Sequence, residues 1–265
     1  MTVPVFYSIS DDFTKYAAVS LNSLVKHANP ETDYTVYFLN QDLSGQHKQD
    51  LSDLGIQNVH IKFFHIDDDI AKLYNTELGN NLFGACTDSS IQYVAKMVKY
   101  IKDVLALDPK KYINSGMLVM NSKAFRDEHF INHFMNLLER YHFDCIAPDQ
   151  DYLNEIGEGR ILHLDPRWDA MPNENTKPLK NPGLIHYNLF FKPWHFKNVQ
   201  YEDYFWQSAK ETKFYNELKA ELNNYTDAER ADDREKLNHI LLKEDKTEQD
   251  PNNWARVKER EAVKL

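Results

Sequence analysis

The chain lacks the short motifs that identify several large enzyme classes. It has no Gly-x-Gly-x-x-Gly after its first apolar run, no Gly-x-x-x-x-Gly-Lys-Ser/Thr loop and no Gly-x-Ser-x-Gly turn. The first two absences argue against a dinucleotide dehydrogenase and a P-loop enzyme. The third argues against a serine hydrolase with a nucleophile elbow.

Cysteine, positive charge and long apolar runs are also scarce. The two cysteines, Cys86 and Cys145, are too few for a disulfide scaffold in 265 residues, so we expect them to be structural thiols in a reducing cytoplasm. The net charge of -10 and the absence of a basic block argue against nucleic acid as a partner. No run approaches the ~20 apolar residues of a membrane span, and the first residues do not resemble a signal peptide.

What is present is a regular alternation of strand and helix signals. Residues 3–9, 34–40 and 59–66 are rich in β-branched and aromatic residues. Between the first two of these runs, apolar residues recur at helical spacing over residues 17–25. Ser44 is a suitable cap for a short helix that ends near Gly55. This order predicts an α/β fold with a mostly parallel sheet, whose ligands bind at the carboxyl ends of the strands.

The remainder of the chain continues with mixed elements and ends in helices. Strands are predicted at 82–86 and 113–121, a helix capped by Asn121 or Ser122 at 122–141, and another helix from Asp149 to Gly157. Residues 201–242 are helical and charged, and Trp254 and Val257 are the only apolar anchors of the tail. We therefore divide the chain into an α/β domain at 1–200 and a helical, charged extension at 201–265.

Several polar groups stand where such a sheet would bind a ligand. Asp11 follows the first strand, where its carboxylate can accept hydrogen bonds from a uracil or ribose, or can cap a helix. Asn114 and Gly116 form a small strand entrance that suits a sugar or a tight turn. Asp149 begins a helix, a position that also suits a purely structural carboxylate.

Five stretches in order resemble the bacterial family 8 glycosyltransferases, which are retaining galactosyl- and glucosyltransferases of the galactosyltransferase-C type. They are "YSISDDFTKYAAVSLNSL", "DDIAKLYNTELGNNLFGACTD", "YINSGMLVMNSKAFR", "PDQDYLN" and "IHYNLFFKPWHF". The resemblance implies a GT-A type nucleotide-diphospho-sugar transferase fold, with one mixed, mostly parallel sheet flanked by helices.

The last stretch matches a His-x-x-Gly-x-x-Lys-Pro-Trp motif that closes over the donor diphosphate in the family. His186 is implied to bind a metal and the diphosphate, and Lys192 to stabilise the charge that develops on the leaving group. Trp194 would fix the loop by packing, whereas His195 is expected to be structural. Leu189 stands where the family has glycine, which is a departure in the part of the loop that approaches the phosphates.

The resemblance also assigns residues to the donor and to catalysis. The donor-binding residues implied are Ile9, Asp11, Asn114, Ser115, Gly116, His186 and Lys192. Gln150 and Asp149, with Lys192, are implied to be catalytic, and Asp151 is expected to act structurally at a helix N-terminus.

The metal-binding Asp-x-Asp of the family has no clear counterpart. Asp67 and Asp69 are candidates if the domain is shortened. Alternatively, Asp67 ends one strand, Asp69 begins a later loop and the metal-binding segment is missing, an interpretation that the fit of "DDIAKLYN" to that loop favours.

Taken together, the resemblance implies a retaining, Mn²⁺- or Mg²⁺-dependent hexosyltransferase. The donor would be UDP-glucose or UDP-galactose, and the acceptor a glycan or glycolipid of lipopolysaccharide or another cell-surface glycan at the inner membrane face, with peripheral membrane association at most. The alternative is a non-catalytic GT-A-like protein that binds a nucleotide or sugar and lacks the Asp-x-Asp motif.

Overall fold

A computed structural model of the chain describes residues 2–9, 11–39, 44–60, 70–190 and 192–261. The chain forms two compact units, each assembled from two separate segments. Unit 1 comprises Met1–Thr76 and Arg167–Arg230, and unit 2 comprises Glu77–Pro166 and Ala231–Leu265. The boundary near residue 200 that the sequence suggests stays a prediction.

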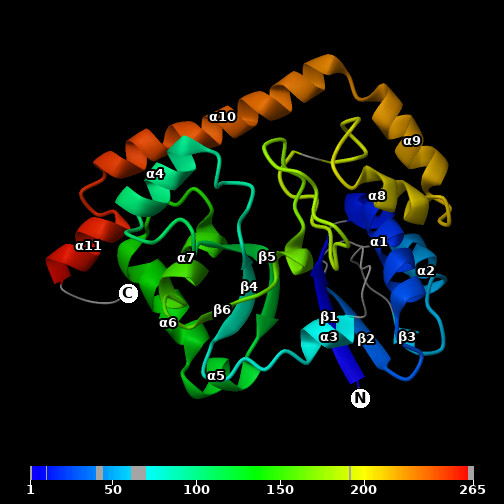
Figure 1. The fold of residues 1–265 in the computed structure, drawn as a ribbon, viewed down its shortest axis with the longest axis horizontal. Coiled ribbons are helices and arrows are strands. Elements are labelled where there is room, and N and C mark those ends of the chain that lie inside the picture. The colour runs from blue at the N-terminus through cyan, green and yellow to red at the C-terminus, as the bar shows by residue number, and fades with distance from the viewer. Residues whose placement is uncertain (1, 10, 40–43, 61–69, 191, 262–265) are drawn as a thin grey trace. The chain divides into compact units, whose positions relative to one another are not determined.

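Unit 1 is built on a parallel three-stranded sheet with β2 in the middle. Val3 pairs with Tyr34, and Tyr34 pairs with Val59, so the predicted parallel order of the first three strands is confirmed. Helix α1 packs against α2 and α8 (Figure 1). The elements of this unit are β1 (Thr2–Ser8), η1 (Asp11–Phe13), α1 (Thr14–His27), β2 (Asp33–Leu39), α2 (Gly45–Ser52), β3 (Val59–His60), α3 (Ile70–Tyr74), η2 (Pro166–Asp169), α8 (Glu202–Ala209) and α9 (Tyr215–Asn224).

In unit 1, the start of α2 and the buried face of α1 agree with the sequence. The Ser44 hydroxyl accepts a hydrogen bond from the His47 N–H at 3.1 Å, which makes Ser44 the N-cap of α2. On α1, the predicted apolar stripe is buried against the unit's own core, including Ala18 and Leu21 at 0% exposure.

Unit 2 is built on a mixed three-stranded sheet with β4 in the middle. β4 runs antiparallel to β5, with Phe83 opposite Met120, and parallel to β6, with Phe83 opposite Ile161. Its elements are β4 (Phe83–Thr87), α4 (Ala95–Asp103), β5 (Ile113–Met120), α5 (Ser122–Asp127), α6 (Phe130–Tyr141), α7 (Pro148–Ile156), β6 (Ile161–His163) and α11 (Trp254–Glu261). Helix α10 (Asp227–Gln249) begins in the last residues of unit 1 and continues in unit 2.

The helix predicted at 122–141 is two helices. Asn121 caps the first by accepting the Ala124 N–H at 3.0 Å, as expected. His129 then has φ +52°, a left-handed conformation that an α-helix cannot contain. The break brings Phe125 and Phe130 together in a stacked pair, with ring centroids 4.1 Å apart.

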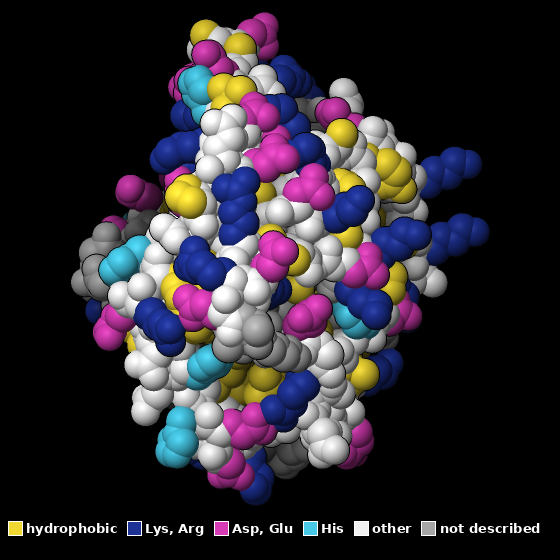
Figure 2. All heavy atoms as spheres, turned by 90° about the vertical axis from the view of Figure 1, so that its left-hand side faces the viewer, with side chains coloured by type: hydrophobic (Ala, Val, Ile, Leu, Met, Phe, Trp, Pro, Cys, Tyr) yellow, Lys and Arg dark blue, Asp and Glu magenta, His cyan; other side chains and the backbone are white. Residues whose placement is uncertain are grey.

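Charged residues attach α10 to α4 within unit 2. Lys99 binds Glu244 at 3.0 Å and Glu248 at 2.5 Å, and Lys96 binds Asp245 at 2.7 Å. The neighbouring Glu248 and Glu244 carboxylates raise the pKa of Lys99. Figure 2 shows basic and acidic side chains interspersed over one face of the molecule, as these pairs would produce.

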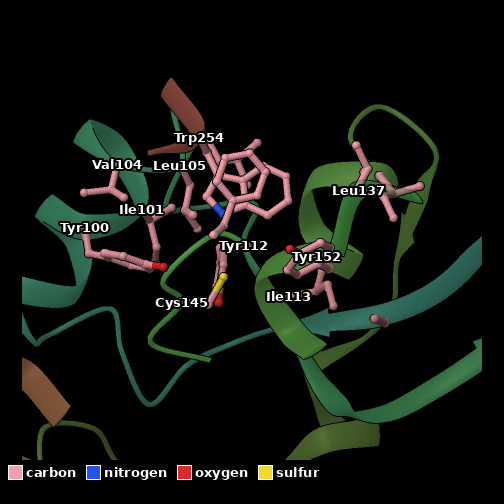
Figure 3. Close-up of a cluster of buried hydrophobic side chains, with 14 of the residues drawn as sticks. Tyr100, Ile101, Val104, Leu105, Tyr112, Ile113, Leu137, Cys145, Tyr152 and Trp254 are labelled. Carbon is pink, nitrogen blue, oxygen red and sulfur yellow. The ribbon is translucent and has the colours of Figure 1, made fainter. Parts of the chain in front are cut away.

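The tail is fixed by Trp254, as the sequence suggests. Its indole is completely buried and stacks on Phe143 at 3.7 Å, with Tyr152 edge-on at 4.7 Å. Figure 3 shows the Trp254 ring beside Leu105 in this cluster. Val257, one turn further on, is also fully buried, so α11 belongs to the core of unit 2.

We predict that Trp254→Ala lowers the free energy of unfolding by about 3–5 kcal/mol, because it leaves a large cavity in a close-packed core. Leu242→Ala is the control, since Leu242 on α10 is 56% exposed and its loss should change stability by no more than about 0.5 kcal/mol. Urea unfolding of both variants checks this. Equal stability of the two variants would show that α11 does not belong to the cooperative core.

Candidate active site

His186, Lys192, Pro193 and Trp194 belong to one loop, here called the KPW loop. This loop follows a short pair of extended segments in unit 1. Ala170 and Ile185 form an isolated parallel bridge. The Ala170 N–H donates to Leu184 O at 2.9 Å, and the His186 N–H donates to Ala170 O at 3.0 Å. His186 therefore stands at the end of a fixed backbone segment.

The imidazole of His186 is held from one side. Its Nδ1 lies 3.0 Å from an oxygen of Asp169, whose side chain is fully buried. Nε2 makes no hydrogen bond to the part of the chain that the structure describes. A neutral imidazole held in this way suits Mn²⁺ as a nitrogen ligand.

A complete metal-binding set is absent from the described residues. Among them, no three His, Cys, Asp or Glu side chains converge on one point. The sequence candidates Asp67 and Asp69 lie outside the described residues. The metal-binding roles of His186 and of the acidic candidates stay predictions.

Lys192 is a cation with little water around it. Burial lowers its pKa to about 8. Its ammonium group donates to the carbonyl oxygen of Tyr187 and lies 5.7 Å from the centre of the Trp194 ring. A desolvated cation of this kind is a strong partner for an anionic ligand.

Trp194 fixes the KPW loop by packing, as expected. The indole is 8% exposed and stacks on Tyr16 of α1 at 4.4 Å, with Phe205 of α8 at 5.0 Å. His195 is structural: its ring stacks on Tyr225 at 3.9 Å, and Nε2 lies 3.0 Å from Glu221.

Leu189 has φ +44°, in the left-handed region that favours glycine, and its side chain is 48% exposed. Leu189 stands where the family has glycine, and its backbone has a conformation that glycine adopts more readily than leucine. The conformation costs a leucine about 1–2 kcal/mol.

Asp11 does not cap α1, whose N-cap residue Phe13 makes no side-chain cap hydrogen bond. Its carboxylate accepts the Ser44 N–H at 2.6 Å and contacts His47 Nδ1 at 2.9 Å. The Ser44 N–H and then His47 lower the pKa of Asp11. Ile9 packs against the core of unit 1. The donor-binding roles of Ile9 and Asp11 stay predictions.

In unit 2, the buried carboxylate of Asp88 brings the predicted sugar-binding residues together. One oxygen accepts hydrogen bonds from Asn114 Nδ2 at 3.0 Å and Gln150 Nε2 at 3.1 Å. The other accepts the Ser90 N–H at 2.9 Å and the Ser90 hydroxyl at 2.5 Å. The end of β4 is thereby tied to β5 and α7.

Ser115 and Gly116 complete this arrangement. We call the set the Asp88 cluster; its members are Asp88, Asn114, Ser115, Gly116, Asp149 and Gln150. The Ser115 N–H donates to Gln150 Oε1 at 2.9 Å, and its hydroxyl donates to Asp149 at 2.8 Å. The Gly116 N–H donates to Asn114 Oδ1 at 2.8 Å. Gln150 is 8% exposed, whereas Asp149 is exposed at the first turn of α7.

Asp151 has a larger structural role than a helix N-terminus alone would give it. Its fully buried carboxylate accepts the hydroxyls of Tyr100 at 2.8 Å and Tyr112 at 2.6 Å, and the Ala147 N–H at 3.1 Å. Desolvation raises its pKa to about 6, although these hydrogen bonds lower it.

Comparison with known proteins identifies the family. A model of "Glycosyl transferase family 8" matches residues 64–198, slightly more than half of the chain. The chain belongs to glycosyl transferase family 8. The resemblance inferred from the five stretches is therefore confirmed.

Individual relatives agree with this membership. A Haemophilus influenzae protein named "Putative glycosyltransferase" is 28% identical over 156 residues, which cover 54% of this chain and 46% of that protein. The chain spans about half the length of the curated relatives it matches.

Solved structures support the fold of this family 8 chain. The apo structure of the bifunctional glycosyltransferase WbbM has a TM-score of 0.73 at 21% identity, covering 83% of this chain and 51% of that one. The galactosyltransferase LgtC, solved with donor and acceptor sugar analogues, has a TM-score of 0.64 at 19% identity, covering 84% of this chain and 100% of that one. The predicted α/β fold of GT-A type is confirmed.

Two further expectations concern the thiols and the membrane. Cys86 and Cys145 are buried free thiols. Among the described residues of this family 8 chain, no helix is both long and apolar enough to cross a membrane.

Sequence reasoning missed two buried carboxylates that contact the candidate residues. Asp88 directly follows β4, so its position at the carboxyl end of a strand was a usable signal. Asp169 lies in a 3₁₀ turn, and nothing in its neighbourhood in the sequence indicates that it contacts His186.

We predict that Leu189→Gly maintains the free energy of unfolding or raises it by up to about 1 kcal/mol, because glycine adopts this φ without strain. Leu179→Gly is the matched control in the same unit, since Leu179 is 38% exposed and does not have a positive φ. It should lower stability by about 0.5–1 kcal/mol through added freedom of the unfolded chain. Equal losses in the two variants, measured by urea unfolding, would contradict the strain at Leu189.

A pH dependence of stability follows from Asp151. Its pKa is higher in the folded chain, at about 6, than the ordinary 3.8, so the folded state binds more protons between these values. The free energy of unfolding should fall by about 2–3 kcal/mol as pH rises from about 4 to about 6. Asp151→Asn should flatten this part of the profile whatever its overall stability, and an unchanged slope would show that Asp151 is not responsible.

Proposed function

We propose that this chain is a retaining glycosyltransferase that moves a hexose from a UDP-sugar, UDP-glucose or UDP-galactose, to a glycan or glycolipid acceptor with the aid of Mn²⁺ or Mg²⁺. Family 8 membership supports the reaction class. The observation that carries the proposal is the KPW loop, which presents the poorly hydrated cation of Lys192 and the Asp169-held imidazole of His186.

These two groups suit the diphosphate half of the donor. Breaking the bond between the anomeric carbon and the phosphate oxygen leaves the electron pair, and a growing negative charge, on the diphosphate. Lys192 stabilises that charge more strongly in its desolvated position than it would in water. A divalent metal, for which His186 supplies one nitrogen, adds Lewis-acid stabilisation of the same charge.

The Asp88 cluster of unit 2 carries groups of the kind that bind sugar hydroxyls. Asn114 and Gln150 are held in fixed orientations, as recognition of sugar hydroxyls requires. Gln150 Oε1 accepts one hydrogen bond from Ser115 and keeps a second lone pair, and Asp149 is exposed. Retention can proceed by double displacement through Gln150 or Asp149, or by same-face attack with the leaving phosphate as base.

A non-catalytic nucleotide- or sugar-binding protein is the second candidate. It is favoured by one observation, that the described residues contain no convergent set of acidic ligands. Such a protein would bind UDP without needing a metal.

The proposed acceptor suggests where the protein works. A glycolipid or cell-surface glycan precursor would place it in the cytoplasm at the inner face of the membrane. The protein's acidic composition supports the absence of a nucleic-acid partner.

The function is tested by ligand binding and turnover. We predict that UDP with Mn²⁺ raises the melting temperature more than UDP alone, because metal and diphosphate share one site.

Lys192→Met, which keeps the apolar stem, should lower the rate of UDP-sugar hydrolysis by about 10²-fold, the size of losing one stabiliser of developing charge.

In the unchanged protein, kcat/KM for UDP-sugar hydrolysis should fall as pH rises through about 8, where Lys192 loses its proton.

Lys219→Met is the matched control. Lys219 also lies over an aromatic ring of unit 1, 3.5 Å from the centre of Trp206, and burial lowers its pKa too. Its replacement should leave hydrolysis unchanged. Equal thermal shifts by UDP with and without Mn²⁺, together with no turnover, would contradict the proposed enzyme and support the non-catalytic alternative.

A further inference from the structure

The carboxylate of Asp169 is fully buried, with 0% side-chain exposure, and one of its oxygens lies 3.0 Å from Nδ1 of His186. Removing a carboxylate from water is unfavourable unless donors replace the water. The contact with His186 supplies one such donor.

Backbone hydrogen bonds hold the segments that carry these two side chains next to each other. The N–H groups of Gly183 and Leu184 both donate to Arg167 O, at 2.8 and 2.9 Å, and two further hydrogen bonds join Ala170 to Leu184 and His186. A Cβ added at Gly183 would lie 3.0 Å from the Trp168 ring, so glycine allows this close approach. Segments 167–170 and 183–186 are therefore locked in one register.

The chemistry of the pair determines which ring nitrogen is available. An ionised carboxylate only accepts hydrogen bonds, so Nδ1 of a neutral His186 must carry the proton. The lone pair then resides on Nε2, the nitrogen without a hydrogen bond to the described chain. A metal can bind only the nitrogen that bears the lone pair.

A second histidine–carboxylate contact of unit 1, between His195 and Glu221, has the opposite arrangement. His195 uses Nε2 to contact Glu221, and its ring face is covered by Tyr225. That arrangement serves packing, whereas the one at His186 leaves the outer nitrogen available.

We propose that Asp169 is a positioning residue for the transfer reaction: it holds His186 as the Nδ1–H tautomer and orients Nε2 toward the metal–diphosphate. This inference rests on the proposed function. It adds a residue outside the five stretches that carry the family resemblance, and it assigns that residue an effect on metal affinity.

The test uses Asp169→Asn in the full chain labelled with ¹⁵N-histidine, with the His186 signals assigned by their loss in His186→Gln. At about pH 8, where histidine is neutral, the unchanged protein without metal should show His186 as the Nδ1–H tautomer. The asparagine amide can donate to Nδ1, so Asp169→Asn should shift the ring toward the Nε2–H tautomer. The dissociation constant for Mn²⁺ in the presence of UDP should rise about 10- to 100-fold.

Asp50→Asn is the matched control, because Asp50 is a buried aspartate of the same unit that pairs with Lys213 and has no contact with His186. It should lower stability without changing the tautomer or the Mn²⁺ affinity. An Nε2–H tautomer in the unchanged protein, or an unchanged tautomer or Mn²⁺ affinity in Asp169→Asn, would overturn the role of Asp169. Binding of UDP by the unchanged protein without any response to Mn²⁺ would instead overturn the metal-dependent function.

Discussion

Two sets of candidate residues, one in each unit, depend on carboxylates that are buried and must therefore find hydrogen-bond donors. Asp88 joins β4, β5 and α7 by accepting from Ser90, Asn114 and Gln150. Asp169 fixes His186 in unit 1. In each case the cost of removing the charge from water is offset only when the surrounding polar side chains stand in one arrangement. The same bonds that stabilise the fold therefore orient the groups assigned to chemistry.

Local features of the fold could be predicted from the sequence. The alternation of strand and helix signals predicted the parallel arrangement of β1 to β3. The caps at Ser44 and Asn121 follow from side-chain chemistry, and Trp254 was the evident anchor of a polar tail. These features depend on residues close together in the chain. The break at His129 was missed, because the apolar spacing of 122–141 suits one helix and the stacking of Phe125 on Phe130 is a tertiary gain.

The site was predictable only in part, for a related reason. Lys192, Trp194, Gln150 and Asp149 stand in recognisable motifs, and the structure gives each a defined environment. The partners that hold them come from distant segments: Tyr16 for Trp194, Asp88 for Gln150 and Asp169 for His186. No spacing rule connects such pairs, since the contacts exist only after the chain has folded. The glycine-like backbone of Leu189 is a similar case, because leucine gives no sign of a left-handed conformation.

The attachment of α10 to α4 has a consequence for the conditions under which the protein is handled. This contact uses lysines against Glu244, Asp245 and Glu248, and most of these side chains are accessible to solvent. The Debye length falls from about 10 Å at 0.1 M ionic strength to about 3 Å at 1 M, so concentrated salt screens such pairs while strengthening apolar contacts little. The aromatic core around Trp254 does not depend on ionic strength in this way. Strong salt therefore weakens the ion pairs between α10 and α4, whereas the stacking of Trp254 of α11 on Phe143 is not screened.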